Sequence, residues 1–365
     1  MDRLLLSRNR AIIKLGKIVL PILCQAEIRG KAGEFAVKAV LPLRLCVAVL
    51  CLVSATCGNA GAETLRIGVQ KTGTFAWQLD VIKRHGLARD NGLDLDIKEL
   101  ASPEAGKLAL NGGSVDVAVV DWLWAARERA LGRALKFYPY STAVGAIMVK
   151  EGSPLRQLSD LKGRSLAVAG GALDKSWLMV RAAALRRGID LPRQASLLFG
   201  APPLLYEKLR QGEADASLNF WNFCARLESQ GYRKLYDVRD AEAELGLAEP
   251  IAVIGYVFSA AFLSAHPGTI DRFLDAAQKA DRIMLESDAE WESLRPLMAA
   301  EDQSTFEAYR ATGRSTMPRR SIDDEESDAR KLFRTLAEIG GPELVGPSKE
   351  LDEQLYYRRP TVPEN

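Results

Sequence analysis

The sequence predicts an α/β fold made of two similar units and a group of C-terminal helices. Short apolar runs with strand-like character alternate with helix-like segments from residue 65 onward, and a second series of the same kind begins after Pro154. Because strands that alternate with helices usually form parallel pairs, we expect mixed, mostly parallel sheets with helices on both faces.

The first series contains three strand-like and three helix-like segments. The strand-like segments are residues 65–70, 93–100 and 115–120, and the helix-like segments are residues 76–91, 103–111 and 122–131. Glycine follows each helix-like segment, as it commonly does at the C-terminal end of a helix. This order predicts one β-α-β-α-β-α unit.

The second series repeats this arrangement. Its strand-like segments are residues 164–170, 195–200 and 214–220, and its helix-like segments are 174–187 and 203–211. Residues 146–151 and 251–259 are also strand-like, and we expect them to connect the two units. We therefore predict one lobe from residues 63–145 and 252–365, with helices over 268–340, and a second lobe from residues 146–251.

Composition and charge exclude some classes of partner. Hydrophobic residues make up 47% of the 365 residues, which is typical of a globular protein. The formal charge of +2 includes a basic N-terminus, and residues 63–365 alone carry 40 basic and 44 acidic residues. That part of the chain has no basic run suited to phosphates, so we expect no nucleic-acid partner.

The N-terminal segment has the features of an export signal. Arg44 precedes an apolar run of 13 residues, 45–57, and Ala60-Gly61-Ala62 has the small-x-small pattern that signal peptidase recognises. The run is shorter than the roughly 20 residues of a membrane-spanning helix. We therefore predict a signal peptide in residues 1–62, cleaved after Ala62, and a periplasmic protein. A membrane anchor and a lipid on Cys57 are the alternatives.

The candidate site consists of strand-to-helix turns, because ligands of open parallel sheets bind at the carboxyl ends of strands. Hydroxyl, amide, carboxylate and indole groups gather in these turns. The ligand-binding candidates are Lys71, Thr72, Thr74, Asp121, Trp122, Ser141, Thr142, Gly171, Asp174, Trp177, Asn219, Trp221, Asn222 and Tyr256. The alternatives are helix capping by the polar groups and core packing by the aromatic rings.

The turn at residues 169–179, AGGALDKSWLM, raises the question of what its helix start faces. The glycine pair permits a close approach, and unpartnered N–H groups at a helix start favour an anion. Asp174, however, is itself suited to cap this helix. Asp121 and Asp174 accompany Lys71 and Lys175 in the turns, so we expect a small organic ligand rather than an inorganic anion, with the charge of its head group open.

The sequence gives little support for catalysis. His85 and His266 are far apart, and neither has a partner pattern around it. The metalloprotease, hydrolase, P-loop and CxxC motifs do not occur. Four of the five cysteines precede residue 63, so only Cys224 remains after cleavage, and a buried thiol is its expected role. We expect no catalytic residue, no metal and no cofactor.

Five pieces of the sequence, which together span about residues 65–290, carry a family resemblance. They are LRIGVQ, LNGGSVDVAVVD, LSDLKGRSLAVAGG, LRQGEADASLNFW and VIGYVFSAAFLSAHPGTIDRFLDAAQKADRIM. In their order and spacing they resemble the solute-binding proteins of nitrate/sulfonate/taurine-type ABC importers. The resemblance implies a two-lobed periplasmic-binding-protein fold of type II, with a ligand between the lobes and closure about a hinge.

The resemblance also implies where the ligand lies. Carried over by position, the ligand turns of the family fall at Lys71–Thr74, Asp121–Trp122, Ser141–Thr142, Gly171–Trp177, Asn219–Asn222 and Gly255–Tyr256. Two turns differ from the family. Trp221-Asn222-Phe223 stands where members often have Trp-Glu-Pro, and Leu173-Asp174-Lys175 stands where small or hydroxyl residues often open the helix. Both differences argue against nitrate or a simple sulfonate.

The function implied by the resemblance is that of a periplasmic solute-binding component of an ABC importer. We expect a monomer that captures a small-molecule ligand and passes it to an ABC permease in the inner membrane. A periplasmic sensor subunit is one alternative. Another is an enzyme on the same fold, such as a thiamine-pyrimidine synthase, although those enzymes rely on a Cys-rich motif that is absent from this sequence.

Overall fold

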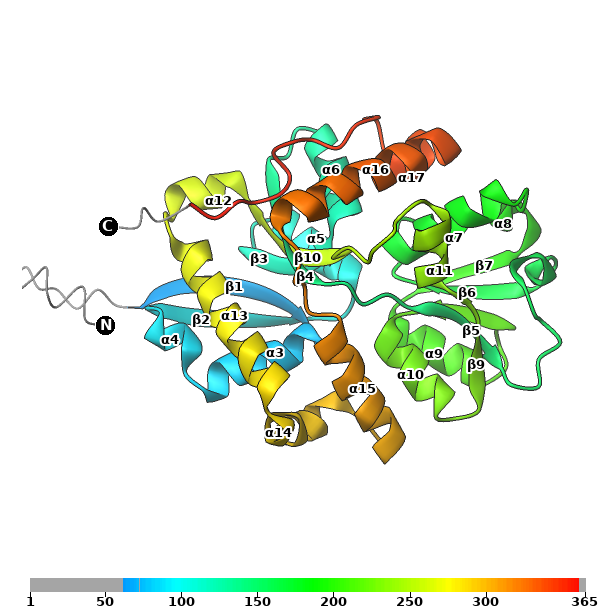
Figure 1. Ribbon diagram of the computed structural model, residues 1–365, viewed down its shortest axis with the longest axis horizontal. Helices are drawn as coiled ribbons and strands as arrows, with labels where there is room; N and C mark the ends of the chain where they lie inside the picture. Colours follow the sequence, from blue (N-terminus) through cyan, green and yellow to red (C-terminus); the bar gives the residue numbers. More distant parts are fainter. Residues whose placement is uncertain (1–61, 72, 361–365) are drawn as a thin grey trace, which may run out of the picture. The chain divides into compact units, whose positions relative to one another are not determined.

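The computed structural model describes residues 62–71 and 73–360 (Figure 1). The predictions for residues 1–61 and for Thr72 lie outside the described residues. Within these residues, ten strands form two five-stranded sheets, and 15 α-helices surround them. Of the helices described, none is both long and apolar enough to cross a membrane.

The first sheet has the strand order β2-β1-β3-β10-β4. Its strands are β1 (Glu63–Gln70), β2 (Leu93–Leu100), β3 (Val117–Asp121), β4 (Leu135–Ser141) and β10 (Ile254–Ser259). β1 pairs in parallel with β2 and β3, whereas β10 runs antiparallel to β3 and β4. The sheet is therefore mixed, and its parallel part has the carboxyl ends of the strands at one edge.

The second sheet repeats this arrangement with the order β7-β6-β8-β5-β9. Its strands are β5 (Ala146–Lys150), β6 (Ser165–Ala169), β7 (Ser196–Gly200), β8 (Ala216–Asn219) and β9 (Tyr232–Asp237). β6 pairs in parallel with β7 and β8, and β5 is antiparallel to β8 and β9. The chain changes sheet twice, between β4 and β5 and again before β10. The lobe boundaries at residues 145/146 and 251/252 stay a prediction.

Helices follow most strands in both halves of the chain. Around the first sheet these are α3 (Phe75–Arg84), α4 (Leu87–Asp90), α5 (Pro103–Asn111) and α6 (Trp122–Ala130). The second series has η1 (Leu158–Leu161), α7 (Lys175–Arg186), α8 (Leu191–Gln194), α9 (Pro202–Arg210), α10 (Trp221–Glu228) and α11 (Val238–Glu244). The helix expected over residues 76–91 is divided, because Gly86 adopts a left-handed conformation between α3 and α4.

The C-terminal part is helical, as the sequence predicts. It comprises α12 (Ala260–Ala265), α13 (Thr269–Glu286), α14 (Asp288–Met298), α15 (Gln303–Ser315), α16 (Ile322–Gly340) and α17 (Pro342–Val345). In Figure 1, α13 passes over the first sheet near α3, and α16 extends towards α7. These helices therefore connect elements that lie far apart in the sequence.

Two large apolar clusters stabilise the first sheet from opposite faces. β3 shows this by its alternation, because Val117 belongs to one cluster and Ala118 and Val120 to the other. The cluster around Val120 continues through α7 and α16 into the second sheet, where it includes Leu166 of β6. Both sheets thus share one buried core along α16.

The segment between α15 and α16 contacts one connection between the sheets, and the first turn of α16 contacts the other. In the first connection, Thr142 donates its backbone N–H to the carbonyl oxygen of Thr316 at 2.9 Å. In the second, the N–H of Ala252 donates to the carboxylate of Glu325 at 2.8 Å. Arg239 of α11 adds a bond to the carbonyl oxygen of Thr142 at 2.7 Å. Residues 316–325 therefore position both connections.

Candidate functional site

A pocket of about 100 Å³ lies where strand ends and helix starts from both sheets meet. The first sheet contributes the end of β1, the end of β3 and the start of α3. The second contributes the starts of α7 and α10, and the connection at residues 143–145 forms part of the wall. This is the edge at which open parallel sheets place their ligands.

Asp121 ends β3 and caps α6 at one side of this pocket. Its Oδ1 accepts a hydrogen bond from the N–H of Trp124 at 2.7 Å. Its Oδ2 lies 3.2 Å from Nζ of Lys107, which α5 supplies. Burial lowers the pKa of Lys107, but the negative charges of Asp121 and Asp174 outweigh burial, so this pKa lies above its usual value. Lys107 therefore carries a charge and pairs with Asp121.

Asp174 plays the same part on the other side, at the start of α7. Its Oδ1 accepts from the N–H groups of Ser176 at 2.9 Å and Trp177 at 3.4 Å. Its Oδ2 pairs with Nζ of Lys175 at 3.2 Å, and that ammonium lies 4.3 Å from the centre of the Phe220 ring. The start of α7 thus faces its own carboxylate, which answers the question raised by the sequence AGGALDKSWLM.

Glycine is required next to this carboxylate. Gly170 has φ +86°, and a Cβ at this position would lie 2.5 Å from Oδ2 of Asp174. Gly171 has φ +90°, but the nearest atom to its Cβ would be Oε1 of Glu104 at 3.6 Å. The pair therefore serves the turn, and Gly170 also makes room for the Asp174–Lys175 ion pair.

The remaining wall of the pocket is largely aromatic. Phe75 and Tyr140 line it from the first sheet, and Phe220, Trp221 and Phe223 line it from the start of α10. The Trp221 ring is held edge-on by Trp77, with 6.0 Å between ring centres, and by Tyr309, with 5.6 Å. These contacts fix an apolar face opposite the ion pairs.

Five of the predicted site residues line this pocket: Thr74, Asp121, Asp174, Trp221 and Asn222. Ser141 instead lines a smaller neighbouring cavity. Thr142 is bonded to the segment before α16, and Asn219 donates from its amide to the carbonyl oxygen of Pro202 at 3.1 Å. Lys71 is exposed and, like Gly171, lies outside the pocket lining.

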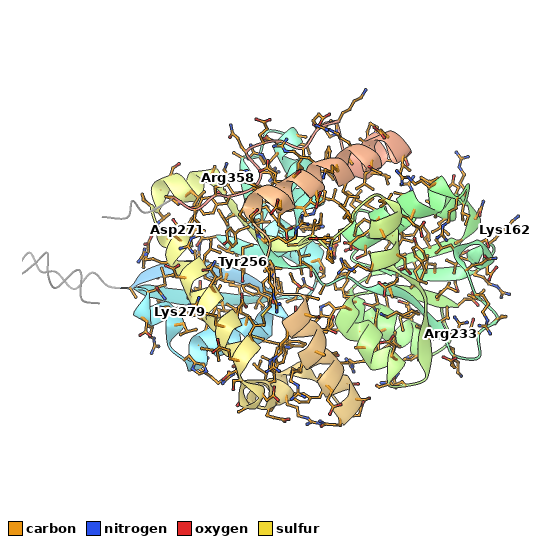
Figure 2. The ribbon with its side chains drawn as sticks, in the orientation of Figure 1. Lys162, Arg233, Tyr256, Asp271, Lys279 and Arg358 are labelled. Atoms are coloured by element: carbon orange, nitrogen blue, oxygen red, sulfur yellow. The ribbon has the colours of Figure 1, made fainter. Side chains whose placement is uncertain are left out.

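Three aromatic candidates are placed in the core rather than at the pocket. Trp122 is fully buried and packs near Phe333 of α16, and Trp177 packs near Phe199 of β7. Tyr256 lies within the first-sheet half of the molecule (Figure 2), and its hydroxyl donates to Oε1 of Gln78 at 2.7 Å. Burial raises the pKa of Tyr256 well above its usual range, so the hydroxyl stays protonated.

Sequence reasoning missed several residues that shape the pocket. Lys107 lies in the middle of a helix, 14 positions before Asp121, and no local signal connects the two. The need for glycine at position 145 is visible only in the structure, where a Cβ would overlap the carbonyl group of Asn219. The aromatic residues Phe75 and Phe220 adjoin predicted turns, so they were within reach of the turn argument.

The described residues offer neither an accessible thiol nor a group of metal ligands. Cys224 is buried, and burial raises the pKa of its thiol to about 12. Among residues 62–71 and 73–360, no group of three or more His, Cys, Asp or Glu side chains is placed to hold a metal ion. The site as described is suited to binding through ion pairs, amides and aromatic faces.

Known structures share this fold. The alkanesulfonate-binding protein SsuA from Xanthomonas axonopodis pv. citri, bound to MOPS, matches with a TM-score of 0.65 at 21% identity, over 81% of this chain and 99% of that one. The periplasmic aliphatic sulphonate binding protein SsuA from Escherichia coli matches with a TM-score of 0.59 at 21% identity, over 79% and 95%. No match was found among curated protein sequences.

A third match, with a lower TM-score, shows the same fold. The Candida albicans CA3427 gene product, described as having the generic periplasmic binding protein fold, matches with a TM-score of 0.56 at 15% identity, over 76% of this chain and 90% of that one. The fold of the chain is therefore that of the periplasmic binding proteins, and the predicted fold class is confirmed.

The family follows from the sequence itself. Residues 81–290, more than half of the chain, match the model described as "NMT1/THI5 like". The chain belongs to the NMT1/THI5-like family, and the resemblance to solute-binding proteins of nitrate/sulfonate/taurine-type importers is confirmed by this match and by the shared fold.

Proposed function

We propose that this protein is the periplasmic solute-binding component of an ABC importer. In this proposal it captures a small organic ligand between its two lobes and delivers it to a permease in the inner membrane. The observation that carries the proposal is the pocket at the strand ends, to which both sheets contribute. The lobes proposed are residues 63–145 with 252–365, and residues 146–251.

The lining of the pocket supports an organic ligand. Phe75, Tyr140, Phe220, Trp221 and Phe223 supply apolar faces that an inorganic anion cannot use. The volume of about 100 Å³ is somewhat smaller than the roughly 150 Å³ of an engineered cavity that binds benzene. The similar proteins from X. axonopodis and E. coli are described as binding sulfonates, which are organic molecules with an anionic head group.

Export to the periplasm is part of the proposal. β1 begins at Glu63, the first residue after the proposed cleavage site. Its carboxylate accepts hydrogen bonds from Thr269 and His266, both at 2.7 Å, and pairs with Arg272. A mature chain that starts at Glu63 would keep all of β1. Mass spectrometry of the protein purified from the periplasmic fraction tests this start directly.

The ligand is tested by a thermal-shift screen of that purified protein. The screen includes alcohols, carboxamides, amines, carboxylates, sulfonates and inorganic anions. A ligand at 100 times its dissociation constant adds about 2.7 kcal/mol to the free energy of unfolding, which is readily measured. We expect organic compounds to raise the melting temperature. A shift by nitrate, sulfate or bicarbonate alone would contradict an organic ligand.

Trp221 is the residue to change first, because its ring lies in the pocket wall and is held by neighbouring aromatic rings. Trp221→Ala should weaken binding of the organic hit by more than about 1 kcal/mol, or at least fivefold. Phe199→Ala is the matched control, because Phe199 is an exposed aromatic residue outside the pocket lining. Chemical conversion of the hit during incubation would instead support an enzyme.

A further inference from the structure

We infer that the pocket selects ligands whose head group carries no net charge and can both donate and accept hydrogen bonds. The inference rests on the proposed solute-binding function and refines it, because it names the class of ligand. It starts from a feature of the pocket wall, in which acidic and basic groups are already paired with each other inside the protein.

The charged groups that line the pocket among the described residues are Asp121, Asp174 and Lys175. Asp121 is paired with Lys107 and Asp174 with Lys175, each at 3.2 Å. The four side chains are only 4–12% exposed, so water screens these pairs weakly. The two pairs together carry no net charge.

The surroundings of the first pair are also balanced. The negative charge of Glu104 acts on Lys107, and the negative charge of Asp121 acts on the positively charged Arg127. Glu104 and Arg127 carry opposite charges, and neither belongs to the pocket lining. The ligand therefore does not meet a field of one sign.

The backbone donors that an oxyanion would use are occupied at two of the helix starts. Asp121 accepts from the N–H of Trp124 at the start of α6. Asp174 accepts from the N–H groups of Ser176 and Trp177 at the start of α7. A carboxylate at a helix start also offsets the positive end of the helix dipole. At these two helix starts, an anionic ligand would have to displace the carboxylates or lie beside them.

A charged head group gains little binding free energy in such a pocket. An anion attracted by Lys175 is repelled by Asp174, whose carboxylate is 3.2 Å away from that ammonium. A cation attracted by Asp174 is repelled by Lys175 in the same way. Either ion would lose its hydration without gaining an unpaired charged side chain among the described residues of the pocket lining, which makes binding unfavourable.

A neutral polar head group can form more favourable contacts in this pocket than an ion can. Each ion pair presents ammonium N–H donors and carboxylate lone pairs side by side. A carboxamide, urea, lactam or hydroxyl group donates and accepts at once, so it can bond to both partners without separating them. The aromatic wall around Phe75 and Trp221 then receives the apolar body of the ligand.

Three probes of nearly equal shape test this selection in the unmodified protein. They are benzamide, which is neutral, benzoate, which is an anion, and benzamidine, which is a cation. Butyramide, butyrate and butylamine form a second series for a narrower pocket. Titration calorimetry at pH 7.5 should show that the neutral member binds at least tenfold more tightly than either ion, which corresponds to about 1.4 kcal/mol.

Two substitutions should change the selection in opposite directions. Asp174→Asn keeps an oxygen that can cap α7 but leaves Lys175 without its carboxylate. The affinity for benzoate should therefore rise at least tenfold relative to the affinity for benzamide. Lys175→Gln leaves Asp174 without its ammonium partner, so the affinity for benzamidine should rise relative to the affinity for benzamide. The double variant, Asp174→Asn with Lys175→Gln, should again favour benzamide.

Asp237→Asn is the matched control. Asp237 also caps a helix, since its Oδ1 accepts from the N–H of Arg239 at 2.9 Å. It also pairs with a lysine, because its Oδ2 lies 2.9 Å from Nζ of Lys234. It does not belong to the pocket lining. The Asp237→Asn variant should therefore bind the three probes in the same order of affinity as the unmodified protein.

The outcomes separate the two proposals. Tighter binding of benzoate or benzamidine than of benzamide by the unmodified protein overturns the inference, while solute binding stands. If neither series binds, the net charge of the hit from the wider screen decides, and a charged hit overturns the inference. If no organic compound binds at all, the proposed function itself fails. Melting curves of each variant show whether it is folded, and the comparison within the unmodified protein does not depend on them.

Discussion

The helix starts around the pocket are of two kinds. α6 and α7 begin with Asp121 and Asp174, whose carboxylates accept backbone N–H groups and pair with lysines. α3 and α10 begin after Thr74 and Phe220 and have no side-chain cap. The residue that precedes each helix therefore distinguishes the two kinds of turn, one polar and charge-balanced and the other aromatic.

Backbone conformation explains why Thr74 does not act as a cap. A capping residue normally has an extended backbone, which lets its side chain reach the N–H groups that follow. Asp121 and Asp174 have this conformation, with ψ near 148° and 138°. Thr74 has ψ −21°, so its backbone is already helical. A residue type that commonly caps helices is thus not sufficient evidence of a cap.

The largest effect should come from the aromatic side of this comparison. Trp77 follows the uncapped start of α3, is 4% exposed, and contacts Trp221, Trp291 and Tyr309 edge-on or at a tilt. Trp77→Ala should lower the free energy of unfolding by about 3–5 kcal/mol, because it leaves a cavity in this cluster. Urea unfolding followed by circular dichroism measures the change. A loss below about 1 kcal/mol would show that the cluster does not stabilise this side.

An intermediate effect should come from the glycine pair on the charged side. Gly170→Ala should cost about 2–3 kcal/mol, because it combines a positive φ with a contact against Asp174, whose carboxylate is fixed by the helix start. Gly171→Ala is the matched variant and should cost only about 1 kcal/mol, since it has the positive φ alone. Equal losses in urea unfolding would mean that the Asp174 carboxylate moves freely.

The last effect depends on pH and concerns a buried carboxylate that caps no helix. Burial raises the pKa of Glu242 to about 7, although Arg239 pairs with it. Because the folded protein keeps this proton up to about pH 7 while the unfolded chain loses it near pH 4.5, stability should fall as the pH rises between these values. Over the whole interval the shift corresponds to at most about 3 kcal/mol.

Glu242→Gln tests this prediction, because glutamine has nearly the same shape and stays neutral. The variant should unfold at a higher temperature than the unmodified protein at pH 8, and the difference should shrink at pH 5. Asp281, whose pKa burial raises to about 6, leaves some pH dependence in both proteins. A variant that is less stable at pH 8 would show that the ion pair with Arg239 outweighs the cost of burial.

Much of the architecture could be predicted from local patterns. Apolar runs located all the described strands except β4 and β9, and the turn argument found Asp121, Asp174 and Trp221 at the pocket. The same argument placed Trp122 and Trp177 there too, but these rings pack in the core. A sequence pattern shows that a large ring lies near a strand end; it does not show which side of the helix is covered by another element.

What the sequence by itself determined is local: the order of strands and helices, and the two carboxylates whose hydrogen bonds reach only two or three residues along the chain. What only the tertiary structure decided is which distant groups meet them. Lys107 comes from α5 to pair with Asp121, and α16, about 200 residues later, covers Trp122 with Phe333. Short-range bonds depend on neighbouring residues, whereas charge balance and burial depend on the packing of whole elements.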